Sequence, residues 1–193
     1  MSRIAVLGWG SLIWDRGDLP VALPEGHPWN ENGPRLPLEF VRRSQGGHLT
    51  LVIFNCGTPI RVRWAPLQTE NLDTAILALR EREGRPNKIR TKHVGVWSRG
   101  SDAGVQKSIA EWAESMPLDH VIWTALPSKW PNETGELLDD LFPSEEEAVA
   151  HLKALVKRSD HAKAEEYVRK APEWVRTSYR KAFERELGWT SEP

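Results

Sequence analysis

The sequence predicts an α+β protein folded as one domain, residues 1–193. Up to residue 126, short apolar runs and turn signals alternate with two helical patterns, whereas most of the remainder is typical of helices. The chain has 193 residues, which is enough for one sizeable core and short for two domains. Ten Trp supply large apolar surfaces for burial and exclude a disordered chain.

The composition also excludes several classes of protein. With 26 basic and 27 acidic side chains, the chain has no overall attraction to nucleic acid or to an anionic membrane. One Cys excludes an internal disulfide framework and suits a reducing cytoplasm. No apolar run approaches the ~20 residues of a membrane span. The six His show no close metal-ligand spacing, so we expect no metal site.

The first half is expected to supply most of the strands. Residues 3–8 form an apolar run closed by Gly8, and residues 16–36 are typical of a long ordered loop. Residues 36–43 and 48–54 are predicted strands joined by a hairpin turn over residues 44–47. A further strand over residues 60–64 alternates strictly and would place both of its arginines on one face.

The middle of the chain is expected to alternate helices and strands. A helix is predicted over residues 71–83, because its apolar residues recur at helical spacing and Gly84 follows as a stop signal. Strands are predicted over residues 93–98 and 120–126, and the second is apolar on both faces, which indicates a central strand. A helix near residues 103–116 would bury its apolar stripe, including Trp112.

The last third is predicted to be a helical extension, residues 137–193, after a loop over residues 127–136. Ser144 and Glu147 form a capping-box pattern at the start of one helix. Asp160 is expected to cap a short helix, and Pro172 to open a last helix that Gly188 ends.

A glycine turn follows the first strand and reads Gly-Trp-Gly-Ser-Leu over residues 8–12. Two glycines and a serine allow several backbone N–H groups to point toward one carboxylate or phosphate. A dinucleotide fingerprint is excluded, because position 13 is Ile and helix breakers follow. The alternative is an ordinary tight turn without a ligand.

Two carboxylates near the end of the predicted helix are separated by helical geometry. At about 100° per residue, Glu83 continues the apolar stripe that starts at Leu72, whereas Glu81 lies on the opposite side. A carboxylate on a core-facing stripe is costly unless it is paired. Glu83 is therefore a candidate general acid or base, and the alternative is a helix-end Glu paired with Arg61 or Arg63.

These features resemble the gamma-glutamylcyclotransferases, especially the ChaC type. Residues 4–14, Ile-Ala-Val-Leu-Gly-Trp-Gly-Ser-Leu-Ile-Trp, are similar to the apolar strand and Gly-Tyr-Gly-Ser-Leu-Ile-Trp signature of that family. Arg42 and Arg43 before a strand resemble its double-Arg segment. Residues 79–84, Leu-Arg-Glu-Arg-Glu-Gly, are similar to the element that carries the family's catalytic Glu, and the match falls on Glu83. The resemblance covers residues 4–85.

The resemblance implies a small mixed β-barrel of about six strands with flanking helices, and no metal or cofactor. Trp9, Gly10, Ser11 and Leu12 would bind a γ-glutamyl group, and Arg42 and Arg43 would contribute to substrate binding. Glu83 would move a proton while the α-amine attacks its own γ-carbonyl, which gives 5-oxoproline and a released amine or peptide. Glutathione is one candidate substrate in a cytoplasmic protein.

Two departures from the family pattern support an alternative. Trp9 stands where the family has Tyr, and residues 85–88, Arg-Pro-Asn-Lys, replace the aromatic that usually follows Glu-Gly. The alternative is a non-catalytic module that binds a small ligand or a partner on the same fold.

A third hypothesis, which the net charge disfavours, is nucleic-acid binding through a basic run. That run comprises Arg82, Arg85, Lys88, Arg90 and Lys92. It could instead be a solvated loop or bind an anionic substrate tail. Cys56 lies at a strand-to-turn boundary and is expected to be inert rather than nucleophilic.

Overall fold

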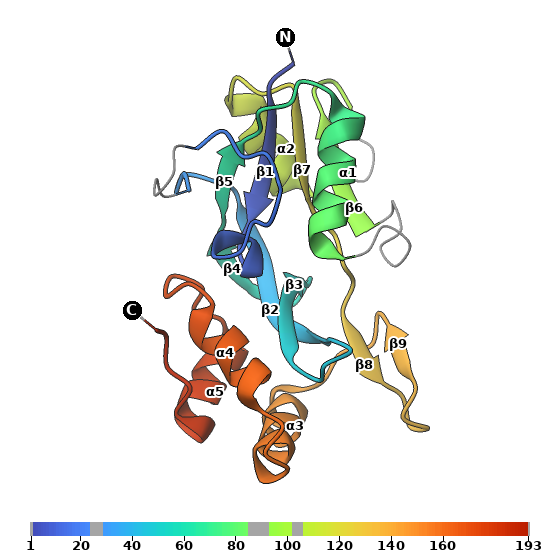
Figure 1. Cartoon of the computed structure of the whole chain (residues 1–193), viewed down its shortest axis with the longest axis vertical. Coiled ribbons are helices and arrows are strands. Elements are labelled where there is room, and N and C mark those ends of the chain that lie inside the picture. Colours follow the sequence, from blue (N-terminus) through green and yellow to red (C-terminus); the bar gives the residue numbers. More distant parts are fainter. Residues whose placement is uncertain (1, 24–28, 85–92, 102–105, 193) are drawn as a thin grey trace. The chain divides into compact units, whose positions relative to one another are not determined.

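The computed structural model describes residues 2–23, 29–84, 93–101 and 106–192. Within these residues the chain has an α+β fold with two β-sheets and five α-helices (Figure 1). Contacts divide it into two compact units. Unit 1 comprises residues 1–36 and 61–126, and unit 2 comprises residues 37–60 and 127–193.

The sheet of unit 1 has the strand order β5-β1-β7-β6. Its strands are β1 (Ile4–Gly8), β5 (Arg63–Pro66), β6 (Val94–Ser98) and β7 (His120–Thr124). β1 pairs antiparallel with β5 and parallel with β7, and β7 pairs antiparallel with β6. The prediction that residues 120–126 form a central strand is confirmed in position, although the strand is shorter.

Helix α1 (Leu72–Glu83) confirms the helix predicted over residues 71–83. Its N-cap is Asn71, whose side chain accepts a hydrogen bond from the Thr74 amide, and Gly84 follows its last turn. Ala75 and Leu79 of α1 are fully buried in a cluster that includes residues of β1, β5, β6 and β7. This cluster fixes α1 against the sheet.

Helix α2 (Lys107–Ser115) buries only part of its predicted stripe. Ile109 and Ala113 are fully buried, whereas Trp112 is half-buried. The indole Nε1 of Trp112 donates a hydrogen bond to the carbonyl of Asn32 at 2.8 Å, and its ring packs edge-on against Trp64. Trp112 therefore lies at the border of the core, because its polar N–H requires a partner.

The sheet of unit 2 has the order β3-β2-β8-β9, with β4 also paired to β2. Its strands are β2 (Arg35–Arg43), β3 (Leu49–Ile53), β4 (Thr58–Arg61), β8 (Lys129–Pro131) and β9 (Leu137–Asp139). β2 and β3 are antiparallel, as predicted. In their turn the Ser44 amide donates to the His48 carbonyl at 2.9 Å, and Gly47 has φ +82°, which favours glycine.

Two predictions about strands and loops are wrong. Residues 60–64 are not one strand, because β4 and β5 pair with different sheets and the amide of Val62 between them bonds to the Pro34 carbonyl at 2.9 Å. The predicted loop 127–136 contains β8, which forms a hairpin with β9. β8 is only three residues long and contains a proline, so it carries no alternation that could be recognised.

Three helices complete unit 2: α3 (Glu145–Lys157), α4 (Ala162–Lys170) and α5 (Ser178–Leu187). The capping box at Ser144 is confirmed, and Gly188 ends α5 with φ +73°. The predicted cap at Asp160 is wrong, since His161 occupies the N-cap of α4.

The last helix begins at Ser178, later than the predicted start near Pro172. The side chain of Arg180 bonds to backbone carbonyls at the predicted start. The guanidinium of Arg180 is 1% exposed and donates to the carbonyls of Ala171 at 2.7 Å and Pro172 at 2.6 Å. These carbonyls are thus satisfied without a helix. Thr177 then caps α5.

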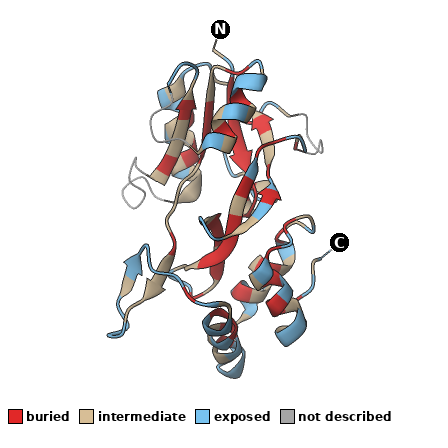
Figure 2. Cartoon of the chain, turned by 180° about the vertical axis from the view of Figure 1, so that it is seen from behind, coloured by how far each residue is buried: buried red, intermediate tan, exposed pale blue. Residues whose placement is uncertain are grey.

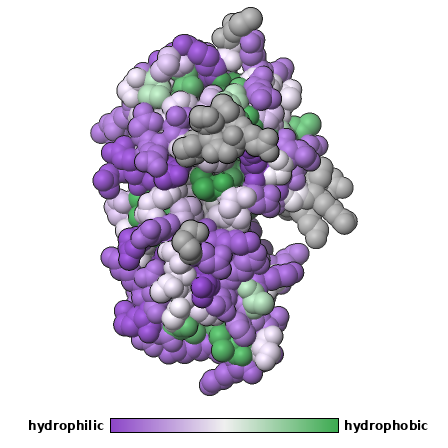
Figure 3. Space-filling model, turned by 60° about the vertical axis from the view of Figure 1, so that its left-hand side comes forward, coloured by the Kyte–Doolittle hydropathy of each residue, from purple (hydrophilic) through white to green (hydrophobic). Residues whose placement is uncertain are grey.

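Buried residues follow the strands of each sheet and the inner faces of the helices (Figure 2). The face drawn in Figure 3 is mostly hydrophilic, with small separate hydrophobic areas. No closed barrel is found in the part of the chain that the structure describes. Among these residues no helix is long and apolar enough to cross a membrane.

Candidate functional site

The glycine turn joins β1 to a short 3₁₀ helix, η1 (Ser11–Ile13), in unit 1. Gly10 precedes η1, and its carbonyl accepts the Ile13 amide at 2.9 Å. A Cβ at Gly8 would lie 3.0 Å from the side chains of both Ile13 and Trp29, so any larger residue would require these two side chains to shift. The first amides of a helix have no partner within it.

The two large residues of the turn are part of the interior. Trp9 and Leu12 are each 5% exposed, and Leu12 belongs to the cluster that also holds Ala75 and Leu79 of α1. The turn and α1 therefore pack on one core. Ser11 is the half-buried member of the turn whose hydroxyl is in contact with α1.

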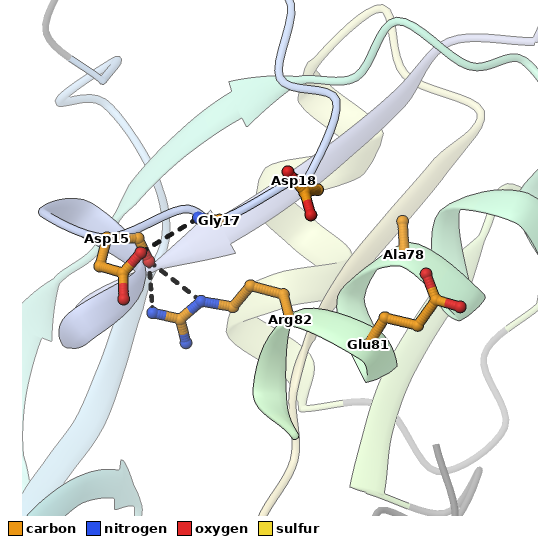
Figure 4. A pocket seen from close by; sticks show the side chains of 6 residues that line it. All are labelled: Asp15, Gly17, Asp18, Ala78, Glu81 and Arg82. Atoms are coloured by element: carbon orange, nitrogen blue, oxygen red, sulfur yellow. Dashed lines mark hydrogen bonds between the residues drawn. The ribbon is translucent and has the colours of Figure 1, made fainter. Parts of the chain in front are cut away.

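Arg82 of α1 makes that contact. Its Nη2 donates to the Ser11 hydroxyl at 3.1 Å, and its Nη1 to the Glu83 carboxylate at 2.5 Å. Its Nε donates to the carbonyl of Asp15 at 3.0 Å, and its Nη2 also reaches that carbonyl (Figure 4). The side chain of Arg82 is only 8% exposed. One guanidinium therefore links the glycine turn, the next loop and Glu83.

Glu83 and Glu81 differ in exposure as helical geometry predicts. The Glu83 side chain is 14% exposed, whereas Glu81 is exposed. The partner of Glu83 is Arg82, not the Arg61 or Arg63 considered from the sequence. Arg61 instead bonds to the Gly33 carbonyl, and Arg63 pairs with Glu31. Glu83 and Ser11 therefore both bond to the guanidinium of Arg82.

A pocket of about 260 Å³ lies next to Arg82. Its lining consists of Asp15, Gly17, Asp18, Ala78, Glu81 and Arg82 (Figure 4). Three of these residues are acidic, and the only cation among them already bonds to Ser11, Asp15 and Glu83. The lining therefore repels an anionic substrate, and we do not assign the substrate to this pocket.

Arg42 and Arg43 belong to unit 2, at the end of β2. Arg42 donates to the Pro127 carbonyl at 2.8 Å and pairs with Asp139 at 3.4 Å. Burial lowers the pKa of Arg42, and Asp139 opposes that shift. Arg42 thus ties β2 to the β8–β9 hairpin, whereas the Nε of Arg43 has no hydrogen-bond partner among the residues that the structure describes.

The remaining candidates add no chemistry to this site. Cys56 is exposed. Of the basic run, only Arg82 lies in the described chain, and residues 85–92 fall outside it. Among described residues, no group of three or more His, Cys, Asp or Glu is arranged to hold a metal ion.

Comparison of the chain with models of known protein families, with curated proteins and with solved structures gave no match. The functional assignment therefore depends on the residues and their geometry.

Sequence reasoning missed three charged residues that the fold buries: Arg82 and Arg180, whose bonds are described above, and Glu39. Arg82 was assigned only to a basic run, although its position next to Glu83 was a signal for an ion pair. Glu39 in β2 is 1% exposed and bonds to the Ser178 hydroxyl at 2.9 Å. The strand pattern contained no signal for Glu39, because its partner is 139 residues away.

Proposed function

We propose that this chain is a gamma-glutamylcyclotransferase-like enzyme in which Glu83 moves the proton. The observation that carries the proposal is the Ser11–Arg82–Glu83 linkage, which ties a shielded carboxylate to the glycine turn. A general acid or base has to be held close to the group that it serves. The sequence resemblance over residues 4–85 supports the same two elements.

In the proposed reaction, the turn residues Trp9 to Leu12 bind the γ-glutamyl group through backbone N–H groups. The α-amino nitrogen attacks the γ-carbonyl carbon, and a new C–N bond closes the five-membered ring. The bond to the leaving amine breaks, and Glu83 passes the proton from the attacking nitrogen to that amine. The products are 5-oxoproline and an amine or peptide, with no oxidant or cofactor required.

The expectations about the barrel and the substrate, which the resemblance implies, form part of this proposal. The barrel implied by the resemblance would correspond to unit 1, whose sheet and α1 carry the turn and Glu83. Arg42 and Arg43, to which the resemblance gives a role in substrate binding, lie in unit 2, and the reaction proposed above uses only residues of unit 1. The protein would act on γ-glutamyl compounds of the cytoplasm, with glutathione as one candidate.

The experiment is 5-oxoproline release from a panel of γ-glutamyl peptides and amines. We expect turnover by the wild type, a loss of at least about 100-fold in kcat for Glu83→Gln, and little change for Glu81→Gln. The two substitutions are matched in chemistry and lie on one helix, so Glu81→Gln controls for helix stability. Equal turnover by wild type and Glu83→Gln would refute the catalytic role.

The second candidate is a non-catalytic module that binds the same kind of ligand. The observation that favours it is that two of the site residues are already engaged by the protein itself: Glu83 is ion-paired and Trp9 is buried. Calorimetric titration with 5-oxoproline and glutamate distinguishes the two. Binding without any turnover across the panel would support the module.

A further inference from the structure

Three exposed apolar side chains lie within five consecutive residues of unit 2. Leu138 of β9 and the two residues Leu141 and Phe142 that follow it are 37%, 40% and 51% exposed. The ring of Phe142 packs against Phe54 at 4.6 Å between ring centroids, yet about half of its surface remains accessible. Large apolar side chains that gather at a surface are typical of a contact with another protein. We call Leu138, Leu141 and Phe142 the Phe142 patch.

The Phe142 patch lies in a strongly acidic stretch of the chain. Residues 130–152 contain seven Asp or Glu and no Lys or Arg. Three of these carboxylates already have partners in the protein: Asp139, Glu145 and Glu147. The other four are exposed and make no ion pair with a described residue: Glu133, Glu136, Asp140 and Glu146. The patch is therefore flanked along the chain by negative charges that lack a counter-charge in the described residues.

The outer edge of β9 is also open. β9 is the last strand of its sheet, and no strand of the described chain pairs with its far side (Figure 1). The Asp140 amide donates to the Ser128 carbonyl at 3.0 Å, so even-numbered residues of this hairpin direct their backbone groups toward β8. The backbone N–H and C=O groups of Leu137 and Asp139 consequently point away from the sheet, where an added strand could bond to them.

The charges decide which occupant suits this surface. A nucleic acid, an anionic membrane or the same surface of a second copy would bring like charges together. A polar basic chain would leave the three apolar side chains of the patch in water. The surface therefore matches a chain that carries both positive and apolar side chains.

We propose that the Phe142 patch and the outer edge of β9 bind an extended basic segment of a partner protein. The backbone of that segment pairs with Leu137 and Asp139, its apolar side chains cover the patch, and its Lys or Arg side chains face the four exposed carboxylates. This surface belongs to unit 2 and does not depend on the proposed cyclotransferase activity, because binding alone tests it.

The probe is a fluorescently labelled synthetic peptide in which Lys alternates with Val or Phe, and the measurement is fluorescence anisotropy with the full chain. One control peptide has Glu in place of every Lys, and another has Ser in place of every Val and Phe. We expect saturable binding of the first peptide alone, and weaker binding at high salt, which screens exposed charges.

Two variants of the surface are each matched by a control. Leu138→Ser should weaken binding by about tenfold, whereas Val156→Ser, at an exposed position about 15 Å along α3 from its start, should bind as the wild type does. Glu136→Gln/Asp140→Asn should weaken binding by about fivefold. Asp160→Asn/Glu166→Gln removes the same charge from exposed positions near the start of α4 and should have no effect.

Circular dichroism establishes that each variant is folded, and amide exchange followed by NMR locates the peptide. Bound peptide should slow exchange at Leu137 and Asp139, and unchanged exchange there would overturn the strand pairing. The proposal is wrong if the basic peptide does not bind, if the acidic peptide binds as tightly, or if folded Leu138→Ser binds as Val156→Ser does. Self-association of the wild type that Leu138→Ser abolishes would assign the surface to a second copy instead.

Discussion

Arg82 and Glu83 are adjacent in sequence, but only the shielding of Glu83 could be predicted from the sequence, whereas the contacts of Arg82 could not. The shielding of Glu83 follows from helical spacing, which separates it from Glu81. The contacts of Arg82 with Ser11 and Asp15 depend on the path of a loop 67 to 71 residues away. In the proposed reaction Arg82 is a positioning residue, because it holds Glu83 and bonds to Ser11 and Asp15.

We predict that Arg82→Gln lowers kcat for 5-oxoproline release by about 10- to 100-fold, because a misplaced general base costs rate even when it is intact. Arg82→Lys should restore part of the loss, since it keeps one charged donor. KM should change less than kcat. Steady-state kinetics of these variants and of Glu81→Gln, the exposed control on the same helix, measures this. A rise in KM alone would assign Arg82 to substrate binding instead.

At the scale of elements, Glu39 connects β2 to the start of α5. Its carboxylate accepts hydrogen bonds from the Phe40 amide at 2.9 Å and from the Ser178 hydroxyl at 2.9 Å. A carboxylate at a helix N-terminus is favourable. Burial nevertheless raises the pKa of Glu39, and the hydrogen bonds from Thr177, Phe40, Ser178 and Tyr179 only oppose that shift.

This raised pKa gives a pH dependence of stability with a defined sign. The folded state holds the proton of Glu39 more tightly than the unfolded state, so its contribution is complete below the ordinary pKa near 4.5 and is lost as pH rises through the folded value. We expect the unfolding free energy of Glu39→Gln to increase relative to wild type from pH 4 to 8, by about 1.4 kcal/mol per unit of pKa shift.

Urea unfolding at several pH values measures this difference. Glu133→Gln, at an exposed loop position, is the control and should follow the wild type at every pH. A constant difference between Glu39→Gln and wild type across the range would contradict the prediction.

At the scale of the whole molecule, the sequence predicts one domain and the contacts divide the chain into two units. Neither unit is a continuous segment, because the chain crosses between them after residues 36, 60 and 126. One of these crossings falls within β4, between Ile60 and Arg61. Because the chain crosses between the units three times, we predict that both units unfold in one cooperative step.

Gly95→Ala provides a test of this cooperativity. A Cβ at Gly95 would lie 2.0 Å from the indole of Trp123, so the substitution should destabilise unit 1 by about 1–3 kcal/mol. In one cooperative domain, the slowest amides of α5 in unit 2 lose the same protection. Hydrogen exchange monitored by mass spectrometry measures both units. Unchanged protection in α5, with loss in β6 and β7, would mean that the units unfold independently.

The sequence by itself determined the α+β class, most strands, α1 with its stop, the capping box and the separation of Glu83 from Glu81. All of these depend on spacing along a few neighbouring residues, which local periodicity records. The tertiary structure alone decided the split of residues 60–64 between two sheets, the β8–β9 hairpin, the late start of α5 and the partners of Arg82, Glu39 and Arg180. Each of these depends on hydrogen bonds or pairings to distant or irregular backbone, whose position becomes defined only when the chain is folded.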